Sequence, residues 1–225
     1  MRVNALVALK TGISRRQADR LIQDRKIQIN DQIAEIGHDY PLDSQVKLAN
    51  HPITDLSLSR TVMLNKPINY VVSRNGQGAL TVYDLLPQNF SNLKAAGRLD
   101  KDSEGLLILS NDGQLLQNLT HPKYLKVKIY EVTLNKSLDL SDFQKINNGI
   151  KLPDGISNMK VSFIHLDQRT SVKVKMHEGR NRQIRRTFNS LNYQVTQLRR
   201  IQFGPYKLNA LKIGEWQEIN KLNQK

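Results

Sequence analysis

The sequence predicts an α+β protein made of a small N-terminal module and a larger body with a mixed, largely antiparallel sheet. In residues 61–225, strand-like runs follow one another without a regular helix between each pair, which argues against a doubly wound parallel sheet. The first fifty residues show two short helical patterns and then a hairpin pattern. A hydrophobic content of 39% over 225 residues supplies enough apolar side chains for a core.

The N-terminal module, residues 1–50, begins with two predicted helices. Val3, Leu6 and Val7 recur at helical spacing, and Gly12 stands where that helix would end. The sequence from Ser14 to Gln17 matches a capping box, which predicts a second helix directly after it. The apolar face of that helix consists of Ala18, Leu21 and Ile22. Three arginines fall outside this face and point to solvent or to a ligand: Arg15, Arg16 and Arg20.

A hairpin completes the module. Ile27 and Ile29 alternate as in a strand, and the Asn30-Asp31 pair is suited to a tight turn before the return strand. Residues 51–60, with a proline and several polar side chains, are expected to form a linker. The remaining residues, 61–225, form the predicted larger domain.

That larger domain alternates irregularly between strand and helix patterns. The strand-like runs are residues 62–64, 70–73, 106–109, 127–134, 161–166 and 172–176. Helices are expected over residues 81–86, 114–119, 140–147 and 182–191.

The charge of the chain points to a polyanionic partner. The net charge is +14, which favours nucleic acid first and an acidic membrane surface second. Residues 171–212 alone carry ten basic residues and one acid, and we expect these basic residues to form a continuous surface. Cysteine is absent, so disulfides and thiol catalysis are excluded and a cytosolic location is expected. No run of residues is apolar and long enough to suggest a membrane span.

Three carboxylates on alternate positions, Asp100, Asp102 and Glu104, precede the apolar run 106–109. Their spacing imitates the first half of an EF-hand loop, but the twelfth position is Asn111 and the second half reads as a buried strand. A glycosidase-like carboxylate pair fits poorly with so basic a protein. Two interpretations stay open, namely a solvated turn and a catalytic carboxylate that pairs with an arginine.

An arginine-rich segment, residues 177–188, follows a predicted strand and enters a predicted helix. The apolar face of that helix consists of Ile184, Phe188 and Leu191. Its other faces carry guanidinium groups suited to phosphates or to a carboxylate: Arg182, Arg185 and Arg186. Between the two polar segments, Tyr130 lies in a predicted strand, where a tyrosine is ordinarily part of the core.

Together these segments resemble the RsuA/RluB/RluF-type ribosomal RNA pseudouridine synthases, and the first module resembles an S4 RNA-binding domain. The resemblance covers nearly the whole chain, with the motifs in family order. They are Asn65-Lys66-Pro67, Gly97-Arg98-Leu99-Asp100, Lys128-Ile129-Tyr130, Glu178-Gly179-Arg180 with the arginines after it, and Phe203-Gly204-Pro205. Three turn positions where the family usually has glycine carry Asp31, Asn69 and Asn209, residue types that tolerate left-handed backbone.

The resemblance implies conversion of uridine to pseudouridine in ribosomal RNA, with no cofactor and no metal ion. It implies that Asp100 is the catalytic aspartate, Arg185 its ion-pair partner and Tyr130 a pocket residue, while Asp102 and Glu104 face solvent or shape the loop. The expected partner is ribosomal RNA, with no membrane, and the expected enzyme is a cytoplasmic monomer. Nine basic residues are expected to bind RNA: Arg15, Arg16, Arg20, Lys26, Arg98, Lys128, Arg180, Arg182 and Arg186.

Two other functions remain as alternatives. A non-catalytic ribosomal RNA-binding or assembly factor on the same fold would share the charge but not need the three implied catalytic residues. A metal-dependent nuclease that uses the carboxylates of Asp100, Asp102 and Glu104 would lose its activity in a chelator.

Overall fold

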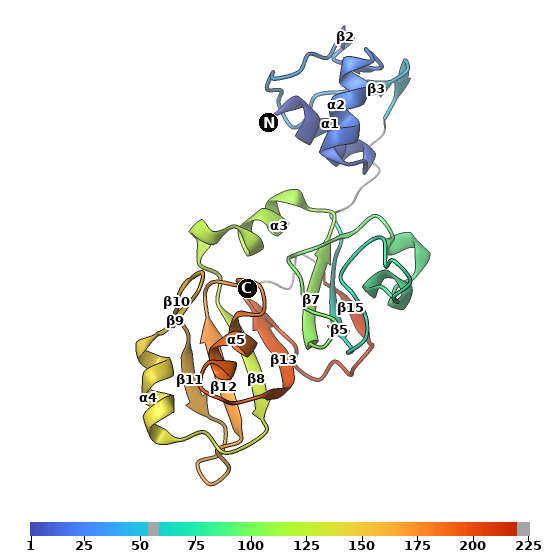
Figure 1. Cartoon of the computed structure of the whole chain (residues 1–225). Coiled ribbons are helices and arrows are strands. Elements are labelled where there is room, and N and C mark those ends of the chain that lie inside the picture. The colour runs from blue at the N-terminus through green and yellow to red at the C-terminus, as the bar shows by residue number, and fades with distance from the viewer. Residues whose placement is uncertain (54–58, 220–225) are drawn as a thin grey trace.

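The structure is a computed structural model that describes residues 1–53 and 59–219. The described chain forms two bodies, each with a hydrophobic core of its own (Figure 1). The predicted α+β class is confirmed, because helices and largely antiparallel sheets occur together in both bodies. No helix in the two described ranges is long and apolar enough to cross a membrane.

The small body packs two helices against a four-stranded antiparallel sheet. Its helices are α1 (Val3–Thr11) and α2 (Arg15–Gln23). The strands lie in the order β2 (Gln32–Ile33), β1 (Ile27–Ile29), β3 (Val46–Leu48) and β4 (His51–Pro52). The sheet therefore extends two residues into the segment expected to be a linker. Residues 54–58 of that segment lie outside the described residues.

Local sequence signals of the small body are confirmed. Gly12 ends α1 in the left-handed conformation, at φ 75°. Ser14 Oγ accepts a hydrogen bond from the Gln17 backbone at 3.2 Å, and the Gln17 side chain accepts one from the Ser14 backbone at 3.0 Å, which completes the capping box. Asn30 and Asp31 turn the hairpin with φ of 49° and 67°.

The large body is built on one nine-stranded sheet. Its main path runs β11 (Lys160–Phe163), β12 (Ser171–Met176), β8 (Lys128–Leu134), β13 (Val195–Phe203), β7 (Glu104–Ser110), β5 (Thr61–Lys66) and β15 (Trp216–Ile219). Two short strands join its middle, β14 (Tyr206–Lys207) on β13 and β6 (Lys94–Ala95) on β7. A separate hairpin consists of β9 (Ile150–Leu152) and β10 (Gly155–Ser157).

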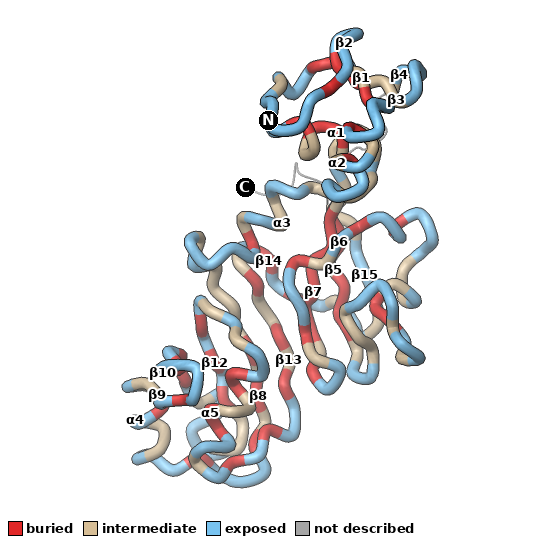
Figure 2. Tube along the Cα trace, turned by 45° about the horizontal axis from the view of Figure 1, so that its top comes forward, coloured by how far each residue is buried: buried red, intermediate tan, exposed pale blue. Residues whose placement is uncertain are grey.

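Strands β7 and β13 join the two halves of this sheet, and theirs is the one parallel contact among the described pairs of strands. It requires a glycine, because a Cβ atom on Gly105 would lie 2.3 Å from the Arg200 carbonyl oxygen. Arg200 is 2% exposed and donates from Nε to the Leu106 carbonyl at 2.7 Å. Nearly all of β7 is buried, whereas β13 mixes buried residues with half-buried and exposed ones (Figure 2).

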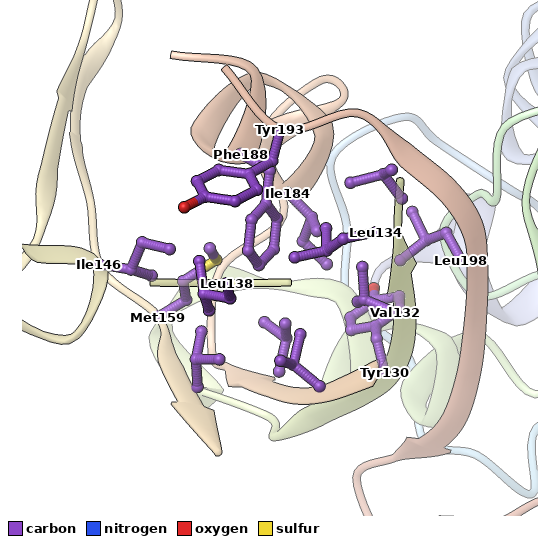
Figure 3. Close-up of a cluster of buried hydrophobic side chains, with 14 of the residues drawn as sticks. Tyr130, Val132, Leu134, Leu138, Ile146, Met159, Ile184, Phe188, Tyr193 and Leu198 are labelled. Atoms are coloured by element: carbon purple, nitrogen blue, oxygen red, sulfur yellow. The ribbon is translucent and has the colours of Figure 1, made fainter. Parts of the chain in front are cut away.

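Three helices of the large body match the predicted ranges to within two residues: α3 (Gly113–Thr120), α4 (Leu140–Asn148) and α5 (Gln183–Asn189). The predicted apolar face of α5 is confirmed, since Ile184 and Phe188 point into the core. They pack there with Tyr130 and Val132 of β8 (Figure 3). This packing fixes the arginine-rich segment against the strand that carries Tyr130.

The prediction of secondary structure was wrong in several places, and the short strands β9, β10 and β15 are among those that were not predicted. Strand β13 was not predicted at all. Residues 70–73 form no regular strand, and Val71 makes an isolated bridge with Thr81 instead. Residues predicted as a helix at 81–86 form a 3₁₀ turn, η1 (Val82–Leu85). In contrast, Asp31, Asn69 and Asn209 all have positive φ, as predicted for residues in place of glycine.

Candidate active site

A cavity of about 280 Å³ opens between the loop before β7, strand β8 and the arginine-rich segment before α5. Asp100 contributes from the loop, Tyr130 from β8 and Arg182 from the segment. The remaining lining residues are Gly97, Arg98, Leu99, Ser103, Met176, Gly179, Arg180, Asn181, Gln183, Ile184 and Leu198. The structure thus brings together three segments that are far apart in the sequence.

The Asp100 loop is anchored on both sides of the carboxylate. Leu99 is buried, and Ser103 is 1% exposed and closes a turn by donating from its backbone to the Asp100 carbonyl at 3.1 Å. The side chain of Asp100 keeps 35% of its surface exposed. A buried frame therefore presents one carboxylate to the cavity.

Lys66 stabilises this frame through hydrogen bonds to its backbone. Its side chain is fully buried at the end of β5, and Nζ donates to three carbonyl oxygens, at 2.9 Å to Pro67, 3.1 Å to Asp100 and 2.7 Å to Ser103. Burial lowers the pKa of Lys66 to about 8, while the negative charges of the nearby carboxylates, Asp100 first, oppose that shift. Lys66 belongs to the Asn65-Lys66-Pro67 motif, and no role was predicted for it. A lysine that ends a run of buried strand residues is the signal that could have identified it.

The arginines pair with the carboxylates differently from the prediction. Arg182, not Arg185, is the guanidinium near the Asp100 carboxylate, with Nη1 at 3.6 Å from Oδ2. Arg182 also donates to both Asp102 oxygens, at 3.0 and 2.9 Å. Arg185 lies 3.3 Å from Asp102 through Nε and donates to the Asp102 backbone carbonyl at 2.7 Å. In the structure, Arg185 thus pairs with Asp102, whereas the resemblance implied a pairing with Asp100.

Local geometry explains the exchange of partners. Arg182 precedes α5 in a left-handed conformation, at φ 46°, from which its side chain reaches the Asp100 loop. Arg185 is set deeper, with 13% of its side chain exposed, and also donates to the Val195 carbonyl at 2.8 Å. Asp102 lies between the two arginines and therefore does more than face solvent. Glu104 instead lines a separate cavity with Glu131 and Arg199.

The pKa shifts around Asp102 agree with this geometry. The hydrogen bonds from Arg182 lower the pKa of the Asp102 carboxyl, and the same bonds raise the pKa of Arg182. Burial lowers the pKa of Arg185, and the negative charge of Asp102 opposes this. The Asp102 carboxylate is thus stabilised in its ionised form beside the cavity.

Tyr130 forms part of the cavity floor. It is 8% exposed and lies opposite Val174 of β12 and Arg200 of β13 in the sheet register. Figure 3 shows its ring among the apolar side chains of the core, near Leu198. Tyr130 thus packs in the core, as expected for a tyrosine in a strand, and also lines the cavity.

The residues predicted to bind RNA fall into two groups. In the small body, Arg16 and Arg20 are exposed, Arg15 donates to the Asn4 side chain at 2.8 Å, and Lys26 lies 3.5 Å from Asp24. In the large body, Arg98 is exposed at the rim of the cavity.

The other large-body arginines have intramolecular partners. Arg180 and Arg186 both pair with Asp154 in the β9–β10 hairpin, at 3.1 and 2.8 Å. Lys128 is partly buried and donates to the Glu178 carbonyl at 3.2 Å. Burial, and secondly the charge of Arg200, lowers the pKa of Lys128.

The basic stretch at residues 171–212 does not form the continuous surface that we predicted. Arg200 is buried in the sheet, and the arginines at 180–186 are paired with Asp102 and Asp154. Lys173 and Lys175 are exposed on β12, at positions that alternate with the buried core residues of that strand. In the described chain, no group of three or more histidine, aspartate or glutamate side chains is arranged to hold a metal ion.

A prediction about stability follows from the buried lysine. The native state releases the Lys66 proton near pH 8, whereas an unperturbed lysine releases it near 10.5. Between these values the unfolded chain binds more protons, so the free energy of unfolding rises with pH. We expect the stability of the wild type, measured relative to Lys66→Met, to increase by at most about 3 kcal/mol over this window. Urea unfolding of both proteins at pH 7.5 and 9.5 measures this change. The same difference in free energy of unfolding between the two proteins at both pH values would contradict a buried charge on Lys66.

The fold and the site define a class of protein: a protein of two bodies, with a carboxylate in a cavity of the large body and exposed arginines on the small body. Comparison with known proteins identifies the family. The RNA pseudouridylate synthase profile matches residues 60–190, and the S4 domain profile matches residues 1–39. The chain belongs to the RNA pseudouridylate synthase family and is a pseudouridine synthase with an S4 domain.

Individual relatives cover most of the chain. Ribosomal large subunit pseudouridine synthase E of Vibrio parahaemolyticus is 34% identical over 188 residues, with 76% of this chain and 78% of the relative covered. Ribosomal large subunit pseudouridine synthase B of Bacillus subtilis is 29% identical over 228 residues, with 97% and 91% covered. A crystal structure of a pseudouridylate synthase has a TM-score of 0.71 at 27% identity, with 99% of this chain and 97% of that chain covered. The predicted family and fold are confirmed.

Proposed function

We propose that this pseudouridine synthase acts on a uridine of large-subunit ribosomal RNA and that Asp100 is its catalytic residue. The observation that carries the proposal is the Asp100 carboxylate, which borders the cavity on a buried frame with Arg182 at 3.6 Å. The choice of RNA is supported by the relatives, which are named as large-subunit enzymes. The proposal includes a monomeric enzyme that acts in the cytoplasm.

The reaction needs no change in oxidation state. The N1–C1′ bond of uridine breaks, the uracil rotates, and C5 joins C1′. The C5 proton leaves and N1 gains a proton, so atoms and electrons balance. Asp100 begins the reaction either as a nucleophile toward the nucleoside or as a base that removes a ribose proton to give a glycal. Both routes require an ionised carboxylate, and the Arg182 guanidinium lies 3.6 Å from that of Asp100.

The other residues of the cavity have distinct proposed roles. Arg182 keeps a positive charge beside Asp100, and Asp102 holds Arg182 in place through two hydrogen bonds. Arg185 fixes the backbone of the same loop from the other side. Tyr130 packs against the base and later accepts the C5 proton. The target base must leave its stack to reach the cavity, as in other enzymes that modify bases.

The direct test is conversion of ribosomal RNA by the purified protein. Large-subunit RNA with tritium at uridine C5 should release tritium when incubated with the wild type. Carbodiimide-dependent primer extension should then show one new pseudouridine, which is absent in RNA from a strain that lacks the gene. Tight binding with no conversion by the wild type would favour the alternative of a non-catalytic binding factor.

We predict that the small body contributes a few positioned phosphate contacts. Exposed Arg16 and Arg20 lie on α2, clear of its buried face. The Arg16→Ala/Arg20→Ala double variant should bind ribosomal RNA more weakly, while its single-turnover rate at saturating RNA stays close to that of the wild type. The slope of log affinity against log salt should fall by about 1.8, from 0.9 per duplex phosphate by analogy with DNA.

Filter binding at several salt concentrations measures that slope. Lys145→Ala is a matched control, because Lys145 is an exposed base on α4 that already pairs with Asp142 at 2.8 Å. An unchanged affinity together with a collapsed rate would show that α2 shapes the active site instead.

A further inference from the structure

The loop between α3 and β8 exposes an apolar side chain between two lysines. It includes the 3₁₀ turn η3 (Pro122–Tyr124), and no acidic residue occurs from 113 to 130. Lys123 is exposed, Lys126 is half-buried, and Leu125 between them is 64% exposed. A large apolar side chain is thus presented to solvent between two cations.

The backbone holds Leu125 in this position. Its φ of 44° and ψ of 42° lie in the left-handed region, which a leucine rarely adopts. The Leu125 backbone donates to the Pro122 carbonyl at 3.1 Å, and His177 Nδ1 donates to the Leu125 carbonyl at 2.7 Å. Non-glycine residues in this region persist when their surroundings fix them, and they are concentrated at functional sites.

The loop borders the cavity at both of its ends. Thr120, just before it, lies 3.9 Å from where a Cβ atom on Gly97 would be. Lys128, just after it, donates to the Glu178 carbonyl, and its Nζ lies 3.5 Å from the Cβ position of Gly179. Gly97 and Gly179 both line the cavity. Residues 121–126 therefore connect two parts of the cavity wall.

We infer that this loop, residues 121–126, contacts the RNA strand beside the target uridine. Leu125 packs against a base next to the flipped nucleotide, and Lys123 and Lys126 neutralise the flanking phosphates. Proteins that distort a nucleic acid commonly place an apolar side chain against an unstacked base, with cations along the backbone. The inference rests on the proposed function, since it supposes that an RNA strand reaches the cavity.

The test replaces the apolar side chain without disturbing the turn. Leu125→Asn removes the apolar contact but keeps a residue that tolerates left-handed backbone. We expect its kcat/KM on large-subunit ribosomal RNA to fall about tenfold, the size of one lost base contact. Leu166→Asn is the matched control, because Leu166 is 85% exposed in the β11–β12 connection and does not line the cavity. It should react like the wild type.

The phosphate contacts are tested separately. A Lys123→Ala/Lys126→Ala double variant should lower the salt slope of RNA binding by about 1.4 to 1.8, at 0.7 to 0.9 per phosphate. The inference would be overturned if Leu125→Asn had the kcat/KM of the wild type and the double variant had its salt slope, with melting temperatures unchanged. Filter binding reports on this surface even if the wild type converts no uridine, so the inference and the proposed function can fail separately.

Discussion

Asp100→Asn will bind ribosomal RNA as tightly as the wild type but will convert essentially no uridine. The amide has the shape of the carboxylate, so the buried frame around Leu99 and Ser103 is kept. An amide is neither a nucleophile nor a base, so both possible first steps are lost. We expect the single-turnover rate to fall by at least about 10⁴-fold, as for other residues that carry the chemistry. Tritium release from RNA labelled at uridine C5 measures it.

Two neighbouring carboxylates provide the controls. Glu104→Gln changes a carboxylate of the same motif that lines a different cavity, and its rate should stay close to that of the wild type. The single-turnover rate of Asp102→Asn should fall about 10- to 100-fold, because Arg182 and Arg185 would then lose the anion that orients them. Equal losses in Asp100→Asn and Asp102→Asn would contradict the assignment of Asp100 as the essential carboxylate.

Substitution of the two arginines beside Asp102 should have different effects: a change at Arg182 should reduce turnover, and a change at Arg185 should reduce stability. Arg182 makes a bidentate contact with Asp102 and lies 3.6 Å from Asp100, so a lysine cannot reproduce its planar pair of donors. We expect Arg182→Lys to lose about 10²-fold in turnover with little change in stability. Arg185 is the more buried partner, and Arg185→Met should lower the free energy of unfolding by about 1–3 kcal/mol, because two backbone carbonyls lose their guanidinium donor.

Single-turnover rates and urea unfolding curves, measured for both variants, show this separation. Arg186→Lys is the matched control on the same helix, because Arg186 makes a bidentate contact with Asp154 and does not line the cavity. Arg185→Lys is measured as a further variant. If Arg182→Lys turns over like the wild type while Arg185→Lys does not, Arg185 is the functional partner of Asp100.

Elements with an uninterrupted local pattern could be predicted from the sequence. Tyr130, Val132 and Leu134 alternate without a break in β8, and all three are buried. Helix α2 has its capping box, and α5 has apolar residues at helical spacing. For these elements, local propensity and tertiary packing agree, so sequence and structure agree as well.

Strand β13 escaped prediction because bulges disrupt its alternation. Its register with β8 shifts between Val195 and Gln197 and again between Arg200 and Gln202. The buried positions therefore do not recur every second residue, and Arg200 reads as a surface residue although it is buried.

The ion pairs of the site posed a different problem. Asp100 and Asp102 are close in sequence, and both were available to Arg182 and Arg185. Only the direction of the loop and the depth of each arginine decided which carboxylate each one meets. The sequence pointed to the carboxylates and arginines of the candidate site, but not to their pairing or to the buried Lys66 beneath them.

The parallel β7–β13 contact joins residues that are far apart in the sequence, so the ribosome makes them at different times. Asp102 emerges 80 residues before Arg182, and Leu106 emerges 94 residues before Arg200. At about 5–20 residues per second, Arg182 follows Asp102 after about 4–16 s of synthesis. Until then the Asp100 loop has neither its guanidinium partners nor the strand that closes the sheet beside it. The nascent chain therefore completes its S4 domain before the segments of the candidate active site can meet, so the small body can fold before the cavity forms.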